Sequence, residues 1–134
     1  MSVKDFTGGQ SAIPASGLNR GYRLLNTIDF SDDEYNVSAS DVVKVLEIQP
    51  NTCVKDVFVR VNTVEGVTAT ADVKDYSTNP SYISSVNINS LGTTQDGLTK
   101  GRIYTALHSL HFVPANNLAN ASIDVIAFCE DLNY

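Results

Sequence analysis

Tryptophan is absent from this sequence of 134 residues, while methionine occurs once and cysteine twice. Two cysteines are too few for a disulfide framework, so we expect Cys53 and Cys129 to pack as small hydrophobic side chains in strands. A disulfide bridge between them is the less favoured alternative. The sequence is instead rich in valine, threonine, serine and asparagine, which is typical of many short strands and not of a helical bundle.

Long hydrophobic runs and basic residues are also scarce. No apolar run approaches the roughly 20 residues of a membrane-spanning helix, and the N-terminal residues lack the apolar core of a signal peptide. Nine Lys and Arg against fifteen Asp and Glu give a net charge of −6, which repels the phosphate backbone of nucleic acids. We therefore expect a soluble protein, made inside the cell, that contacts neither membrane nor nucleic acid directly.

Motifs for catalysis or metal binding are missing as well. The sequence has no glycine-rich phosphate loop, no G-x-S-x-G and no H-E-x-x-H. His108 and His111 are three residues apart in a predicted strand, so we expect their rings to lie on opposite faces and not to share a metal ion. Carboxylate pairs such as Asp72 and Asp75 stand beside turns, where neither member is predicted to be buried. These absences predict a binding protein without cofactor or metal, and not an enzyme.

Strand signals are densest between Asp41 and Asp75. Three apolar-rich runs cover residues 42–48, 57–63 and 67–73. The second and third alternate apolar and polar residues and are joined by Glu65-Gly66, which predicts a hairpin in a meander of consecutive strands. The first run also fits helical spacing, but its β-branched residues and the Pro50-Asn51 turn favour a strand.

The rest of the chain adds strand-like runs on either side of this centre. They cover residues 22–28, 82–88, 101–105, 110–113 and 121–128. Residues 76–100 otherwise read as a long polar loop, and residues 1–20 as an arm in which no regular element is specified. The predicted fold is all-β, an antiparallel β-sandwich domain of residues 21–134 with an extended N-terminal arm of residues 1–20.

The central stretch also carries a resemblance to a known family. The residues concerned are Val45–Ile48, Asn51–Thr52, Val54–Val61 and Glu65–Asp75, followed by the closing strand Ile123–Phe128. Their order resembles small bacteriophage head decoration or cement proteins. The resemblance implies a jelly-roll-like sandwich that stabilises the expanded head shell by binding between major capsid protein subunits. It also implies a homotrimer on the virion head surface, made in the host bacterial cytoplasm.

Contacts with a neighbour are expected at apolar residues of the arm and at tyrosines near strand ends. The candidate interface residues are Val3, Phe6, Ile13, Tyr76, Tyr82 and Tyr104. Tyrosine joins a large apolar ring to a polar hydroxyl and is common at interfaces. The alternative function is a receptor-binding or glycan-binding knob on a phage head or tail fibre, for which Tyr76 and Tyr82 would stack on sugar rings.

Overall fold

The computed structural model describes residues 3–14, 21–75, 82–95 and 102–132, without the side chains of residues 13, 14 and 95. These residues form strands and a single turn of 3-10 helix, η1 (Thr7–Gly9). The strands are β1 (Val3–Asp5), β2 (Ser11–Pro14), β3 (Gly21–Asp29), β4 (Val42–Ile48), β5 (Thr52–Thr63), β6 (Thr70–Lys74), β7 (Ile83–Asn87), β8 (Gly92–Gln95), β9 (Arg102–Tyr104), β10 (His108–Pro114) and β11 (Ser122–Asp131). Within the described part of the chain, no helix is long and apolar enough to cross a membrane.

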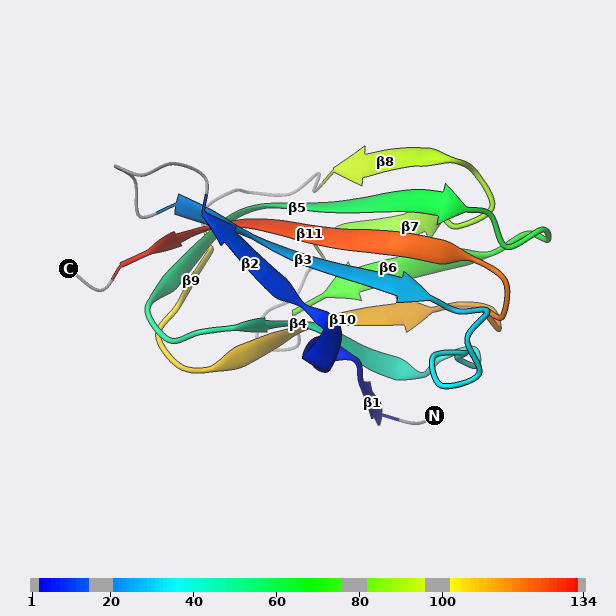
Figure 1. Cartoon of the computed structure of the whole chain (residues 1–134), viewed down its shortest axis with the longest axis horizontal. Helices are drawn as coiled ribbons and strands as arrows, with labels where there is room; N and C mark the ends of the chain where they lie inside the picture. The colour runs from blue at the N-terminus through cyan, green and yellow to red at the C-terminus, as the bar shows by residue number, and fades with distance from the viewer. Residues whose placement is uncertain (1–2, 15–20, 76–81, 96–101, 133–134) are drawn as a thin grey trace.

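The strands form two stacked sheets (Figure 1). Sheet A has the order β1-β4-β10-β6-β7, and sheet B has the order β2-β3-β11-β5-β8 with β9 also paired to β5. All pairings are antiparallel except that of β1 with β4. The predicted all-β fold, an antiparallel β-sandwich, is therefore confirmed.

The predicted meander of consecutive strands is wrong. β4 and β6 lie in sheet A, whereas β5 lies between them in the sequence but pairs only within sheet B. Glu65-Gly66 belongs to a connection that crosses between the sheets, although Gly66 does adopt the positive φ of 97° that its turn requires. Alternation of apolar residues predicts which face of a strand is buried, but it does not specify which strand lies alongside.

The core fills the space between the sheets with the side chains that the alternation predicts. On β5, Val57, Val59 and Val61 point inward, and Ala71 and Val73 of β6 oppose them from sheet A. Phe30 and Phe112 stack at 5.7 Å between ring centroids and are both fully buried. Each such buried aromatic or aliphatic side chain contributes roughly 1.5–3 kcal/mol of hydrophobic stabilisation.

The N-terminal residues bridge the two sheets along one edge. β1 extends sheet A beside β4, and β2 extends sheet B beside β3. The buried amide of Asn26 donates hydrogen bonds to the carbonyl oxygens of Phe6 at 2.9 Å and Val45 at 2.7 Å. Residues 3–14 thus contain regular elements that the sequence did not predict, because strands of three or four residues are too short to show a period and form on a partner strand.

The polar segment of residues 76–100 also contains more structure than predicted. β7 confirms the strand-like run of residues 82–88, and β8 is a further strand that pairs with β5. The turn between them is held by Asn87, whose side chain accepts a hydrogen bond of 2.9 Å from the backbone N–H of Asn89. The two strands belong to different sheets, so this segment also crosses the sandwich.

Candidate functional site

A buried hydrogen-bond network lies at the end of the sandwich where β6 stops. Asp75 follows β6 directly, Tyr104 ends β9, and Tyr82 precedes β7. The Tyr104 hydroxyl donates to Asp75 Oδ2 at 2.5 Å and lies 2.6 Å from the Tyr82 hydroxyl. All three side chains are buried, so the network links both sheets through polar groups that satisfy one another.

Two histidines of β10 extend this network. The His108 ring stacks on Tyr104 with 4.9 Å between centroids, and its Nε2 lies 3.3 Å from Asp75 Oδ1. The His111 ring lies only 6.5 Å from that of His108, edge to face. The rings are closer than strict alternation predicts, and the pairing of β10 with β4 shifts register between Leu110 and His111. No three His, Cys, Asp or Glu side chains in the described ranges are arranged to hold a metal ion.

Burial shifts the pKa values of the two tyrosines and of His111. Burial raises the pKa of Tyr82 to about 12, although the Tyr104 hydroxyl and the Arg102 guanidinium, 4.0 Å above the Tyr82 ring, act in the opposite direction. The pKa of Tyr104 is raised by burial and by its hydrogen bond to Asp75. The pKa of His111 is lowered by burial, then by the nearby charges of His108 and Lys44. Both phenols therefore stay protonated, which suits structural hydrogen bonds and not proton transfer near neutral pH.

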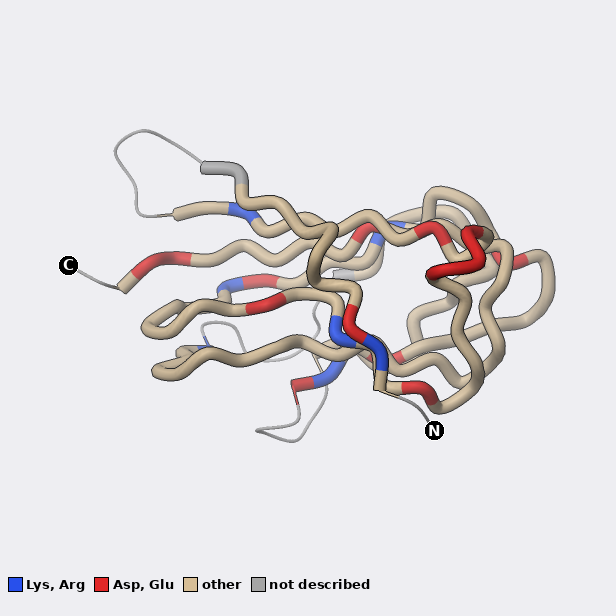
Figure 2. The backbone as a smooth tube through the Cα atoms, turned by 60° about the horizontal axis from the view of Figure 1, so that its bottom comes forward, with Lys and Arg blue, Asp and Glu red and all other residues tan. Residues whose placement is uncertain are grey.

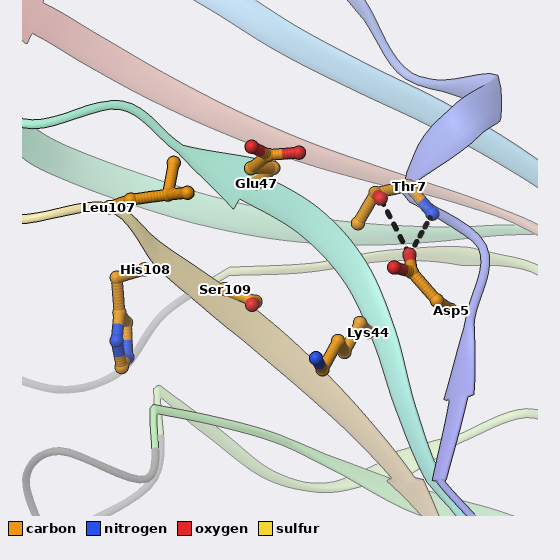
Figure 3. A pocket seen from close by; sticks show the side chains of 7 residues that line it. All are labelled: Asp5, Thr7, Lys44, Glu47, Leu107, His108 and Ser109. Carbon is orange, nitrogen blue, oxygen red and sulfur yellow. Dashed lines mark hydrogen bonds between the residues drawn. The ribbon is translucent and has the colours of Figure 1, made fainter.

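A solvent-open pocket of about 250 Å³ lies beside the network, on the side of β1 and β4 (Figure 3). Its lining residues are Asp5, Thr7, Lys44, Glu47, Leu107, His108 and Ser109. Asp5 accepts hydrogen bonds from the Thr7 hydroxyl at 2.6 Å and the Thr7 backbone N–H at 3.0 Å, which lower the pKa of Asp5. Figure 3 shows the His108 ring extending away from the Ser109 hydroxyl, so these two side chains do not form a nucleophile and base.

A second open pocket, of about 400 Å³, lies between β2 and β3 of sheet B and β4 of sheet A. Its walls combine apolar side chains with two carboxylates. The residues that line this pocket are Gln10, Ala12, Tyr22, Leu24, Glu47, Gln49, Pro50, Thr52 and Asp131. The Gln10 side chain accepts from the Glu47 backbone N–H at 2.6 Å and donates to the Glu47 carbonyl at 3.1 Å, which fixes the rim of the pocket.

The predicted interface residues fall into different environments. Val3 is 64% exposed on β1, whereas Phe6 is buried and packs edge to face on Tyr35 at 4.9 Å. Ile13 lies in β2 opposite Arg23. Tyr76 and the side chain of Ile13 lie outside the described residues.

Tyr82 and Tyr104 are buried in the network described above. The fold therefore already uses Phe6, Tyr82 and Tyr104 internally. Of the predicted interface residues whose side chains the structure describes, only Val3 is exposed to solvent.

The prediction that Asp75 is not buried is wrong, and two further buried carboxylates, Glu65 and Asp124, were not predicted from the sequence. Glu65 accepts hydrogen bonds at 3.1 Å from the backbone N–H groups of residues 119, 120 and 121. Asp124 accepts hydrogen bonds from Thr27 at 2.6 Å and from Arg60. Burial acts to raise the pKa of Asp124, but these hydrogen bonds outweigh it and lower the pKa. All five of these partners are 54 or more residues away in the sequence, so no local pattern signals them.

The two cysteines occupy opposite sides of sheet B. Cys129 is buried in the core, and burial raises the pKa of its thiol to about 12. Cys53 pairs with Glu130, the next residue along β11, and is half-buried on the outer side. Both are free, so the expected packing as a small buried hydrophobe holds for Cys129 and only in part for Cys53.

The fold is similar to that of chains in three solved phage capsid structures. A chain in the capsid of Ralstonia phage GP4 has a TM-score of 0.63 at 13% identity, covering 97% of this chain and 98% of that one. A chain in the cyanophage Pam1 capsid asymmetric unit has a TM-score of 0.62 at 17% identity, covering 90% and 92%. A chain in the acidic stable capsid of Helicobacter pylori bacteriophage KHP30 has a TM-score of 0.58 at 12% identity, also covering 90% and 92%.

Sequence comparison gives no further guidance. No protein-family model matches the chain, and no curated protein matches it in sequence. At 12% to 17% identity, the three structural likenesses show the fold: this chain is an antiparallel β-sandwich of a kind also found in phage capsid structures.

Proposed function

We propose that this chain is a phage virion protein that decorates the expanded head shell and stabilises it by binding between major capsid protein subunits. The observation that carries the proposal is the extent of the fold likeness. Three phage capsid structures contain chains that match at least 90% of this chain and at least 92% of their own length. Because each match covers at least 90% of both chains, the likeness extends over the whole fold and is not confined to a shared fragment. The family resemblance of residues 45–75 favours the same function.

Stabilisation of a shell requires only selective binding. A protein that binds the expanded lattice but not its precursor shifts the equilibrium toward the expanded state by mass action. At a free concentration 100 times the dissociation constant, each filled site contributes about 2.7 kcal/mol. A shell offers many equivalent sites, so modest affinity at each one is sufficient.

The fold suits a binding role of this kind. Two sheets joined by buried networks at Glu65 and Asp75 lose little conformational entropy on binding. Exposed apolar side chains remain available for contact, and Val3 on β1 stands at an edge strand of sheet A. We expect the resident form to be a homotrimer on the head surface, as the resemblance implies.

Binding to shells tests the proposal directly. Expanded shells that lack this chain are mixed with the purified protein, sedimented and assayed for bound protein and for heat stability. We expect saturable binding and a higher temperature of shell disruption, whereas unexpanded shells should bind much less. Equal binding to both shell forms, or none to expanded shells, would refute the proposal, and binding to a glycan array instead would favour the receptor-binding alternative.

The contribution of the N-terminal arm is tested by a charge at its exposed position. Val3→Asp places a carboxylate where an apolar contact is predicted, and Leu91→Asp is the matched control because Leu91 is similarly exposed, at 67%, in the β7–β8 turn. We expect Val3→Asp to weaken shell binding about tenfold, equivalent to 1.4 kcal/mol, with the control unchanged. Deleting the arm is a poorer test, since Phe6 belongs to the core.

A further inference from the structure

The outer face of sheet B carries an apolar patch that is separate from the core between the two sheets. Its members are Leu25, Phe58, Ile103, Ile126 and Phe128, which we call the outer patch. Ile126 of β11 lies in register with Leu25 on β3 and with Phe58 on β5. Phe58 and Phe128 contact each other edge to face at 5.4 Å, and Ile103 adjoins Cys53 on the same side.

These side chains are presented to solvent. Ile103 is 60% exposed and Phe128 is 38% exposed, while the other three are half-buried by their neighbours. β11 and β5 are the most extensively paired strands of the molecule, so the patch sits on its most rigid surface. Leu25, Phe58, Ile126 and Phe128 are register neighbours or in ring contact, and Ile103 lies at the edge of the sheet beside Cys53. A contiguous apolar surface of this kind, in contrast to scattered exposed residues, marks an interaction site.

The charges around the outer patch nearly cancel. The side chains on this face include three bases and four acids: Arg23, Lys55 and Arg60 against Asp29, Asp56, Asp124 and Glu130. Lys55 pairs with Glu130 at 3.1 Å, and Arg60 pairs with Asp124. The face therefore carries about −1 of the net charge of −6. The acidic excess lies elsewhere, including the turn after β3, where Figure 2 shows an unbroken acidic stretch.

This charge distribution indicates which partner fits. Two copies of an acidic chain repel each other over most of their surfaces. The repulsion is weakest between surfaces of low net charge, such as this face. Four of the seven charged side chains form ion pairs within the same copy, so a covering surface needs little complementary charge. A second copy meets these requirements.

The area of the face is adequate for a specific contact. β11 spans ten residues, or about 33 Å at ~3.3 Å per residue. Five strands lie side by side across it, or about 24 Å at ~4.8 Å spacing. The product, about 800 Å², is an upper bound, because β2, β8 and β9 span only four, four and three residues. The face still falls within the range of roughly 600–1,000 Å² that each partner buries in a standard protein interface.

We propose that the outer patch of sheet B joins this chain to a second copy of itself. The proposal concerns the surface between copies and is tested on the purified chain, so it stands independently of shell binding.

The test is the mass of the protein in solution, measured by light scattering over a range of concentrations. We expect a multiple of the 14.5 kDa chain mass. Phe128→Lys and Ile103→Lys should each raise the dissociation constant about tenfold or more. The matched controls Leu91→Lys and Val67→Lys, at positions 67% and 65% exposed in turns, should leave it within about twofold of the wild-type value.

Circular dichroism checks that each variant is folded. If Phe128→Lys unfolds, Ile103→Lys keeps the test valid, since Ile103 is the more exposed residue and lies on the short strand β9. A monomeric wild-type chain at every concentration would overturn the proposal, as would variants of the patch that associate as well as the controls. If monomeric wild-type protein binds shells and the patch variants do not, the shell occupies this face and the proposal is wrong.

Discussion

Two buried carboxylates stand at opposite ends of the same strand and are held in different ways. Glu65 precedes β6 and accepts hydrogen bonds from three consecutive backbone N–H groups and from the Asn120 side chain. Asp75 follows β6 and accepts from the Tyr104 hydroxyl, with His108 at ion-pair distance. The first carboxylate is held mainly by main chain and the second by side chains.

This difference separates two structural roles. Three of the donors to Glu65 are backbone N–H groups and the Asn120 side chain adds one more, so that end depends chiefly on the Glu65 side chain. It fastens the start of β6 in sheet A to the segment that leads into β11 of sheet B. The Asp75 end depends on several side chains of β9, β10 and the residue before β7, so it can be weakened in steps.

Removing Glu65 should have the largest effect on stability. Glu65→Ala leaves three backbone N–H groups without their acceptor near the buried residue Ala121. We expect the free energy of unfolding to fall by about 3 kcal/mol, because hydrogen bonds to a charged group contribute about 1.5–3 kcal/mol and unsatisfied buried donors add their desolvation cost. Urea denaturation measures this change.

Glu65→Gln is the matched control for the loss of the carboxylate. Its amide oxygen can still accept from the same N–H groups, so we expect it to lose only about half as much stability as the alanine variant. A loss below about 1 kcal/mol in Glu65→Ala would contradict the conclusion that the backbone N–H groups hold the Glu65 carboxylate in place.

The Asp75 end should respond less, and in proportion to the bonds removed. Tyr104→Phe deletes the hydroxyl that joins Asp75 to Tyr82, and we expect a loss of about 2 kcal/mol. Tyr82→Phe removes a hydroxyl that has no direct bond to the carboxylate among the contacts described, so a loss of about 1 kcal/mol is expected. Equal losses in urea denaturation would show that Tyr104 does not act as the link.

The strands were predicted well from the sequence because alternate residues of a strand face the core, which gives a period of two. Val57, Val59 and Val61 are buried as expected, and so are Ala71 and Val73. It failed on pairing, since β10 lies between β4 and β6 although more than thirty residues separate it from either. Which strands meet depends on the whole set of connections, and a local pattern of apolar residues contains no such information.

The two ends of β6 show why the candidate site was predicted poorly. Asp75 and Glu65 stand beside turn residues, which in sequence indicate solvent. Both are buried because strands from the opposite sheet, or the loop leading to one, cover them. Tyr82 and Tyr104 were predicted as interface residues, but in the structure they bond to each other, and Tyr104 bonds to Asp75. That network forms only when the fold brings three separate segments together.

The smallest expected effect is a change in the pH dependence of stability through His111. Its pKa is lowered in the folded state from the ordinary 6.5, because burial and the charges of His108 and Lys44 disfavour the protonated ring. Lys74 of β6 is also its register partner, whereas Asp75 acts in the opposite direction. The unfolded chain therefore binds the proton more readily, so stability is retained above pH 6.5 and falls as the pH drops below it.

His111→Gln removes this titration, and its free energy of unfolding should decline less than that of the wild type between pH 7 and about 5. Tyr82→Phe serves as the control, since a phenol with a pKa of about 12 does not titrate in this range and its curve should parallel that of the wild type. Urea denaturation at a series of pH values gives the three curves. If the His111→Gln curve is parallel to the wild-type curve, the acid sensitivity arises elsewhere, and the comparison between the two ends of β6 rests on hydrogen bonds alone.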